Sequence, residues 1–234
     1  MSSPSISLNK FISQTGICSR READRFIEAG RVTINGQVAR KGNRVGRDDQ
    51  VLLDGKPLGD KPRPVYLALH KPAGITSTTD RRDPDNIIDF VGYPQRIFPI
   101  GRLDKASTGL ILLTNDGDIV NDILWEKNEH EKEYIVTVNR PITSRFLERM
   151  AKGVPILGTV TKPCSVTQLN KRAFRIILTQ GLNRQIRRMC QYLGYQVATL
   201  KRVRIMHIEL GELKPGQWRP LTPQELSRLL NRLH

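Results

Sequence analysis

One short segment divides this chain into two parts. Residues 59–64 read Gly-Asp-Lys-Pro-Arg-Pro, with two prolines and charges of both signs. Proline fixes the backbone and removes a hydrogen-bond donor, so regular secondary structure is disfavoured there. We therefore expect an N-terminal module over residues 1–60, a linker over residues 61–65 and a larger domain over residues 66–234.

The N-terminal module is expected to hold two short helices and a small hairpin sheet. Apolar residues at helical spacing over residues 8–12 predict the first helix. Ser19 and Glu22 form the pattern of a capping box, which predicts the start of a second helix. The pair Asn35-Gly36 is a strong hairpin signal, and residues 51–55 give a further strand and turn.

The larger domain alternates strand-like and helix-like stretches, which favours an α+β fold built around a mixed, mainly antiparallel sheet with flanking helices. Strands are expected over residues 65–69, 109–114, 133–138, 174–178 and 203–210. Helices are expected over residues 118–125, 144–152, 184–193 and 223–233.

The charge of the chain points to a polyanionic partner. The formal net charge is +15, and no acidic residue occurs between Arg149 and Ile208. Basic residues without acidic neighbours in sequence indicate a phosphate-binding surface. No stretch has the length and apolarity of a membrane span, and the three scattered cysteines suggest no disulfide framework, so we expect a cytoplasmic protein. A monomer is the default expectation, because no interface signature stands out in the sequence.

A carboxylate lies between two cations in a loop bounded by glycines. Asp104 is flanked by Arg102 and Lys105 within residues 101–110, directly before an apolar strand. Loops at strand ends often carry catalytic side chains, and the adjacent cations would keep Asp104 ionised. A turn or cap residue is the simpler interpretation of Asp104 when this loop is considered alone.

The helix expected over residues 184–193 has one arginine in a special position. Asn183 is a good N-cap, and the apolar residues of this helix share one face. Arg187 lies on the flank of that face, where partial burial would require a carboxylate partner. Arg184 and Arg188 lie on the opposite side and are better placed for phosphates.

Two resemblances give these patterns a function. Residues 8–12, 16–23 and 30–36 resemble the S4 RNA-binding module, in which Arg20, Arg21 and Arg25 would face RNA. Residues 101–110 resemble the central motif of the RsuA family, the group of pseudouridine synthases that act on ribosomal RNA. Residues 67–74, 131–136 and 180–189 resemble further motifs of that family, although His70 stands where the family usually has asparagine.

The second resemblance implies a pseudouridine synthase core and an isomerase that converts uridine to pseudouridine in RNA. It implies that Asp104 is the catalytic carboxylate, that Tyr134 stacks on the target uracil and that Arg187 pairs with Asp104. No cofactor or metal is needed. The RluF type is the most similar subgroup, which suggests 23S ribosomal RNA near the peptidyl transferase centre as substrate, with transfer RNA as an alternative. The residues expected to bind RNA are Arg20, Arg21, Arg25, Lys71, Arg102, Lys105, Arg184, Arg188, Lys201 and Arg202.

Two other functions fit parts of the sequence. A catalytically silent RNA-binding or ribosome-assembly protein would share the basic composition and the S4-like segment. A metal-dependent nuclease could use Asp104, Asp116 and Asp118, but Asp116-Gly117-Asp118 is more simply a turn and a helix start.

Overall fold

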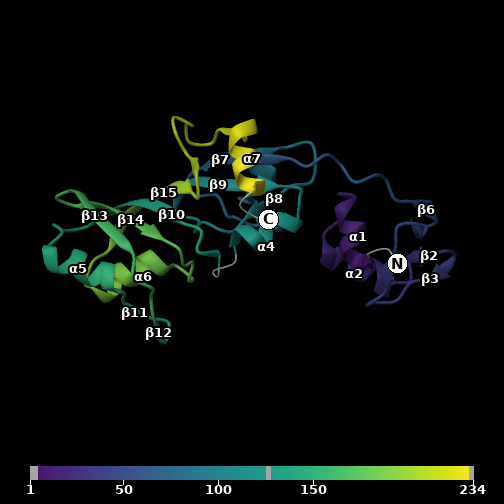
Figure 1. Ribbon diagram of the computed structural model, residues 1–234, viewed down its shortest axis with the longest axis horizontal. Helices are drawn as coiled ribbons and strands as arrows, with labels where there is room; N and C mark the ends of the chain where they lie inside the picture. Colours follow the sequence, from purple (N-terminus) through teal and green to yellow (C-terminus); the bar gives the residue numbers. More distant parts are fainter. Residues whose placement is uncertain (1–4, 125–127, 232–234) are drawn as a thin grey trace. The chain divides into compact units, whose positions relative to one another are not determined.

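The computed structural model describes residues 5–124 and 128–231 and separates into two compact units. The first unit comprises the chain up to Pro64 with the short segments Pro94–Arg96 and Asn115–Gly117. The second unit contains the remaining residues (Figure 1). No helix in the described ranges has the length and apolarity that crossing a membrane requires.

The first unit contains two short helices and two small sheets. Its elements are β1 (Ile6–Ser7), α1 (Leu8–Gln14), α2 (Arg20–Glu28), β2 (Val32–Ile34), β3 (Gln37–Val38), β4 (Arg44–Val45), β5 (Val51–Leu53) and β6 (Lys56–Pro57). Strand β1 pairs with β4, and the other strands form a sheet in the order β3-β2-β5-β6.

The local signals of the first unit are confirmed. The Ser19 hydroxyl accepts from the Glu22 backbone N–H at 3.2 Å, and the Ser19 backbone N–H donates to the Glu22 carboxylate at 2.7 Å, which completes the capping box. Asn35 and Gly36 have φ angles of +50° and +82° and join the antiparallel strands β2 and β3. These left-handed conformations are those that a tight two-residue hairpin turn requires.

The second unit is built on a nine-stranded sheet with helices on its faces. The strands are β7 (Tyr66–Lys71), β8 (Phe98–Ile100), β9 (Thr108–Thr114), β10 (Lys132–Val138), β13 (Ser165–Asn170), β14 (Ala173–Leu178), β15 (Val197–Ile205), β16 (Ile208–Glu209) and β17 (Trp218–Pro220). The helices are α3 (Ile87–Val91), α4 (Asp118–Leu124), α5 (Ser144–Lys152), α6 (Gln185–Tyr192) and α7 (Pro223–Asn231), and a separate hairpin joins β11 (Pro155–Ile156) to β12 (Thr159–Val160).

The main path of this sheet is β13-β14-β10-β15-β9-β7-β17, with β16 paired to β15 and β8 to β9. Among the described pairs of this sheet, β9 and β15 run parallel and the others run antiparallel. The prediction of a mixed, mainly antiparallel sheet is therefore confirmed.

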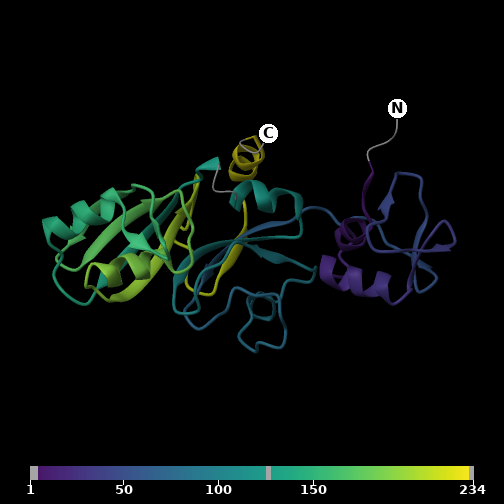
Figure 2. The same cartoon turned by 90° about the horizontal axis from the view of Figure 1, so that it is seen from below.

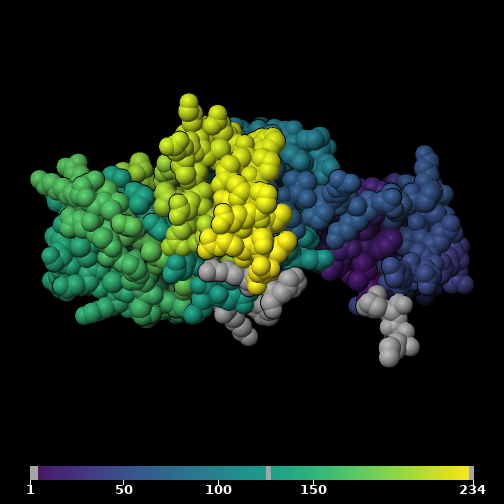
Figure 3. Space-filling view, turned by 45° about the horizontal axis from the view of Figure 1, so that its top comes forward, coloured from purple at the N-terminus to yellow at the C-terminus, as the bar shows by residue number. Residues whose placement is uncertain are grey.

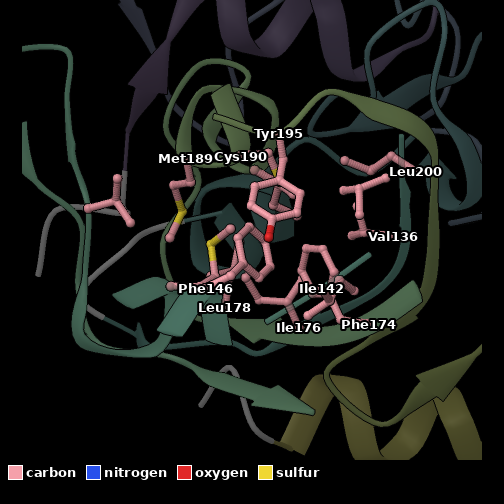
Figure 4. Packing of buried hydrophobic residues seen from close by; sticks show 14 of the residues in the cluster. Val136, Ile142, Phe146, Phe174, Ile176, Leu178, Met189, Cys190, Tyr195 and Leu200 are labelled. Carbon is pink, nitrogen blue, oxygen red and sulfur yellow. The ribbon is translucent and has the colours of Figure 1, made fainter. Parts of the chain in front are cut away.

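Helices α5 and α6 cover the same side of β10, β13 and β14 (Figure 1). Phe146 of α5 packs edge-on against Phe174 of β14, with ring centroids 5.4 Å apart. Met189 and Cys190 of α6 are buried in the same cluster (Figure 4). The inner face of α6 is thus fixed by apolar packing, and this fixes which of its side chains point outward.

The other half of the sheet is covered on both faces. One face packs against α4 and α7 and the other against α3, which lies on the opposite side of the sheet in Figure 2. The C-terminal segment with α7 forms a continuous yellow ridge on the surface of its own unit in Figure 3. Burial on both faces explains why β9 is almost continuously apolar.

The structure corrects the sequence-based elements at several points. The strand expected over residues 203–210 begins earlier, as β15 at Val197, and turns at Met206 into β16. Strand β13 was not predicted, because it is an exposed strand at the end of the sheet path and five of its six residues are polar or exposed. Trp125 and Leu233, the expected ends of two helices, lie outside the described residues.

The parallel junction of β9 and β15 depends on a glycine. Gly109 has a φ angle of +107° and pairs with Arg202. A Cβ atom at position 109 would lie 2.1 Å from the Arg202 carbonyl oxygen and 2.6 Å from its nitrogen. Because these are backbone atoms inside a sheet, they have no room to move apart.

We predict that Gly109→Ala lowers the free energy of unfolding by more than about 3 kcal/mol, because backbone strain and a backbone clash act together. Gly158→Ala is the matched control: its φ angle is +74° with no neighbour within 4 Å of the added Cβ, so about 1–2 kcal/mol is expected. Urea unfolding monitored by circular dichroism measures both. Equal losses in the two variants would contradict the proposed tight junction.

Candidate active site

A cavity of about 820 Å³ opens at the junction of the two halves of the sheet. Its walls are the loop over residues 101–107, the segment over residues 178–187 and single side chains from β10 and β15, all of them in the second unit. Asp104, Tyr134 and Arg187 line this cavity together. The structure therefore brings the three residues predicted as catalytic into one place.

Asp104 is flanked by two arginines. Its Oδ2 atom lies 3.6 Å from Arg187 Nε and 3.6 Å from Arg184 Nη1. The Arg187 side chain is 15% exposed, against 50% for Arg184 and 30% for Asp104. The sequence-based prediction paired Asp104 with Arg187 alone and assigned Arg184 to phosphates. It therefore missed the ion pair between Arg184 and Asp104.

Arg187 also holds the backbone of the Asp104 loop. Its Nη2 atom donates to the Ser107 hydroxyl at 3.2 Å and approaches the Ala106 carbonyl oxygen at 3.5 Å. One guanidinium thus contacts both the carboxylate and the loop that carries it. Such shared contacts fix the orientation of the carboxylate relative to its loop.

Arg184 reaches Asp104 because of an unusual backbone conformation. It is the N-cap residue of α6, with φ +50° and ψ +35°, and its side chain makes no cap hydrogen bond. The predicted cap, Asn183, is therefore wrong by one residue. Asn183 instead accepts two hydrogen bonds from the Arg188 side chain, at its carbonyl oxygen (3.1 Å) and at Oδ1 (3.2 Å).

A second set of hydrogen bonds fixes the Asp104 loop from the side of β7. The buried Ser77 hydroxyl donates to the Leu103 carbonyl at 3.0 Å and accepts from the Leu103 backbone N–H at 3.2 Å. The Gly74 backbone N–H donates to the Lys105 carbonyl at 2.8 Å. No feature of the sequence around Ser77 indicated this role, because a single serine in a loop has no distinctive pattern.

Lys71 and Arg202 do not lie where the sequence placed them. Lys71 is fully buried, and its Nζ atom donates to the carbonyl oxygens of Pro72 and Ile75 at 2.8 Å and of Lys105 at 3.3 Å. Arg202 is 4% exposed and donates from Nε to the Leu110 carbonyl at 2.7 Å. Their burial is unsuited to direct contact with an RNA phosphate, so we correct this part of the prediction: both cations support the site from within.

The other residues predicted to bind RNA are accessible. Arg102 and Lys105 are exposed at the cavity, and Lys105 forms an ion pair of 2.7 Å with the half-exposed Asp85. Arg188 and Lys201 are partly exposed in the same unit. Arg20, Arg21 and Arg25 are exposed on α2 of the first unit.

Tyr134 contributes an aromatic face to the cavity. It lies on β10 between Ile176 of β14 and Arg202 of β15, and it is partly buried against two apolar clusters. A ring held this way is rigid, and because Tyr134 lines the cavity it is placed to offer a stacking surface to a flat ligand.

The cavity carries a strong excess of positive charge. Among the described lining residues, the basic ones are Arg102, Lys105, Lys132, Arg184, Arg187 and Arg202, and Asp104 is the one acidic residue. An anionic ligand is therefore favoured. Within the described ranges no three His, Cys, Asp or Glu side chains are grouped to hold a metal ion, so the carboxylates of the nuclease interpretation do not come together there.

The buried Lys71 ammonium gives a test of this arrangement. Burial lowers the pKa of Lys71 from 10.5 to about 8, against a smaller opposing effect of Asp104. Between pH 8 and 10.5 the unfolded chain therefore binds more protons than the folded chain, and stability from this group rises with pH.

We predict that the unfolding free energy of the wild type, relative to Lys71→Met, increases between pH 8 and 10.5 by an amount on the order of 3 kcal/mol. Urea unfolding of both proteins at several pH values measures this difference. A difference that stays constant over that window would contradict a buried, charged Lys71 at neutral pH.

Known proteins share this fold and these motifs. The family described as RNA pseudouridylate synthase matches residues 65–192, and the S4 domain family matches residues 7–57. The dual-specificity RNA pseudouridine synthase RluF of Salmonella typhi is 57% identical over 94% of this chain and 76% of its own length. Its counterpart in Escherichia coli K12 is 55% identical over 95% of this chain and 77% of its own.

A solved structure described as a pseudouridylate synthase superposes with a TM-score of 0.71 at 31% identity, covering 96% of this chain and 99% of the other. The resemblance to the RluF type is confirmed by the two relatives of that name. Together, the matched family, the relatives and the cavity show that this chain belongs to the RNA pseudouridylate synthase family and carries an S4 domain.

Proposed function

We propose that this protein isomerises a uridine of 23S ribosomal RNA near the peptidyl transferase centre, with Asp104 as its catalytic carboxylate. The observation that carries the proposal is the Asp104 carboxylate, held between Arg184 and Arg187 at 3.6 Å from each, in a cavity whose charged lining residues are mostly cations. Relatives named as dual-specificity enzymes support more than one RNA substrate, so transfer RNA is the second candidate.

The reaction defines what the site has to do. The bond between N1 of uracil and C1′ of ribose breaks, the base rotates, and a bond forms between C1′ and C5. The proton at C5 is then lost and N1 gains a proton, so atoms and electrons balance without a redox partner or a transferred group. Three first steps are open to the Asp104 carboxylate: attack on the ribose, attack on the base, or removal of the proton at C2′.

The two arginines act on Asp104 in different ways. Arg187, which is mostly buried and also bonded to Ser107, fixes the orientation of the carboxylate. Arg184 is half-exposed, so it can hold Asp104 and a phosphate of the substrate together. Arg187 is thus a positioning residue, while Arg184 belongs to the surface that receives RNA.

The ring of Tyr134 takes the place of the stacked bases that the target uracil leaves in the RNA helix. A uridine reaches the cavity only after it leaves its helix, and an aromatic face compensates for the lost stacking. We assign the face of Tyr134 to stacking on uracil and its phenol to removal of the C5 proton.

Binding of RNA is spread over both units. We assign Arg20, Arg21 and Arg25 of the S4 domain to substrate selection, and Arg102, Lys105, Arg188 and Lys201 to phosphates near the cavity. The boundaries 1–60, 61–65 and 66–234 are our proposal for the RNA-binding module, the linker and the catalytic domain. We further propose a monomer that works in the cytoplasm.

A silent RNA-binding protein is not favoured, because the relatives at 55–57% identity are pseudouridine synthases and the family match includes the Asp104 loop.

We predict that Asp104→Asn lowers the rate of tritium release from ribosomal RNA labelled at uridine C5 by roughly a thousandfold or more. The amide keeps the size of the side chain but removes its charge, and chelator is present throughout. The wild type should release tritium and leave the RNA backbone intact.

Asp116→Asn and Asp118→Asn are the matched controls for Asp104→Asn. They remove the other two carboxylates of the nuclease interpretation and should retain activity within about twofold of the wild type. Full activity of Asp104→Asn would overturn the catalytic assignment. Strand cleavage that stops under chelation would support the nuclease instead.

We predict that Tyr134→Phe keeps KM and lowers kcat by roughly a hundredfold, because the stacking face remains and the proton acceptor is lost. Tyr134→Leu should also raise KM, because it has no aromatic face. Steady-state tritium release measures both parameters. An unchanged kcat in Tyr134→Phe would exclude the proton role, and an unchanged KM in Tyr134→Leu would exclude stacking.

A further inference from the structure

Three side chains at intervals of four residues lie at the start of α6 and along its outward face: the N-cap residue Arg184, then Arg188 and Tyr192. Residues four apart lie on the same face of a helix. The opposite face is fixed in the core by Ile186, Met189 and Cys190. Figure 4 shows Met189 and Cys190 in this cluster. From Arg184 to Tyr192 the rise is about 12 Å at 1.5 Å per residue.

This face begins at the proposed catalytic carboxylate. Arg184 Nη1 lies 3.6 Å from Asp104 Oδ2, and the face leads from there toward the C-terminal end of α6. A length of about 12 Å corresponds to roughly three or four stacked nucleotides at a spacing of 3.4 Å. Anything bound along this face would therefore lie next to the target nucleotide.

Tyr192 is exposed although nearby aromatic side chains are buried. It is 52% exposed, while Tyr195, three residues later, is 6% exposed. The Tyr195 hydroxyl donates to the Pro141 carbonyl at 3.2 Å, and the Arg140 guanidinium covers its ring at 4.2 Å from the centroid. Tyr195 is thus a packing residue, whereas the ring of Tyr192 is largely available to a ligand.

Two cations accompany the exposed ring. The Arg149 guanidinium of α5 lies 5.8 Å from the centroid of Tyr192, and α5 and α6 lie side by side in Figure 1. The Arg188 guanidinium donates to the carbonyl and amide oxygens of Asn183, both of which are neutral. No acidic residue occurs in the sequence between Arg149 and Ile208, so α6 itself carries no carboxylate.

We propose that Arg184, Arg188, Tyr192 and Arg149 form a track that binds the RNA strand beside the target uridine. Arg184 and Arg188 contact successive phosphates, Tyr192 stacks on an unpaired base about three nucleotides away, and Arg149 contacts the phosphate next to that base. An exposed aromatic ring among cations is the combination that binds single-stranded nucleic acid without reading its sequence. This inference rests on the proposed function and adds the site of the flanking nucleotides.

The test compares Tyr192→Ala, Tyr192→Phe and Arg149→Met by tritium release from a 23S ribosomal RNA transcript labelled at uridine C5. Loss of a stacked base corresponds to roughly a tenfold rise in KM. Removing an interaction that the ground state and the transition state share leaves kcat unchanged. We therefore expect Tyr192→Ala to raise KM about tenfold, and Tyr192→Phe to restore KM to within about twofold of the wild type.

Arg149→Met should raise KM. It should also reduce the salt slope, which is the slope of log binding constant against log salt concentration, by about one. Arg228→Met is the charge control, because Arg228 is exposed on α7 in the same unit but outside the track. Arg228→Met should change neither KM nor the salt slope. A KM of Tyr192→Ala within twofold of the wild type would overturn the proposal.

A second measurement separates failure of this inference from failure of the proposed function. The same transcript, made with some uridines replaced by 4-thiouridine, is irradiated with the protein, and the cross-linked peptides are identified by mass spectrometry. A cross-link at Tyr192 that is reduced in Tyr192→Ala supports the track even if the wild type releases no tritium, whereas cross-links confined to other segments would contradict it.

Discussion

The parallel pairing of β9 with β15 is the contact on which the site depends. It joins the half of the sheet that carries Asp104 to the half that carries Tyr134 and leads into α6. The Asp104 loop ends where β9 begins, and Gly109 lets that strand approach the backbone of Arg202 more closely than a side chain would allow. Asp104 and the arginines before α6 therefore meet only if this pairing keeps its register.

The charges of the residues around this pairing determine which kind of ligand the cavity can bind. Lys71 and Arg202 are buried beside the Asp104 loop. Backbone carbonyl oxygens accept from the Lys71 ammonium and from Arg202 Nε, whereas Arg202 Nη2 has no hydrogen-bond partner among the described residues. A buried cation without a carboxylate of its own is destabilising, so these two charges are not explained as stability devices. They do raise the electrostatic potential around Asp104, which leaves the cavity attractive to an anionic substrate.

Much of this arrangement could be predicted from local patterns. Helical periodicity placed Arg187 on the flank of an apolar face, and the structure shows it mostly buried and beside Asp104. Lys71 and Arg202 were misplaced, because a charged residue in a strand looks like surface unless its long-range partners are known. The predicted start of strand β15, at residue 203, is too late, because the charged residues Lys201 and Arg202 interrupt the apolar pattern within the strand.

Arg184 shows where local patterns fail and why the failure matters. A left-handed backbone at a residue other than glycine costs about 1–2 kcal/mol, and a cation at a helix N-terminus opposes the helix dipole. Both penalties fall on this one residue, which also gives up the side-chain cap that Asn183 could have provided. Its guanidinium lies beside Asp104, and Arg184 directly precedes the helix that carries Arg188 and Tyr192. The unfavourable backbone is best explained by the site: it turns the N-cap residue toward the carboxylate, while Arg188 and Tyr192 lie on the outward face of the helix that follows.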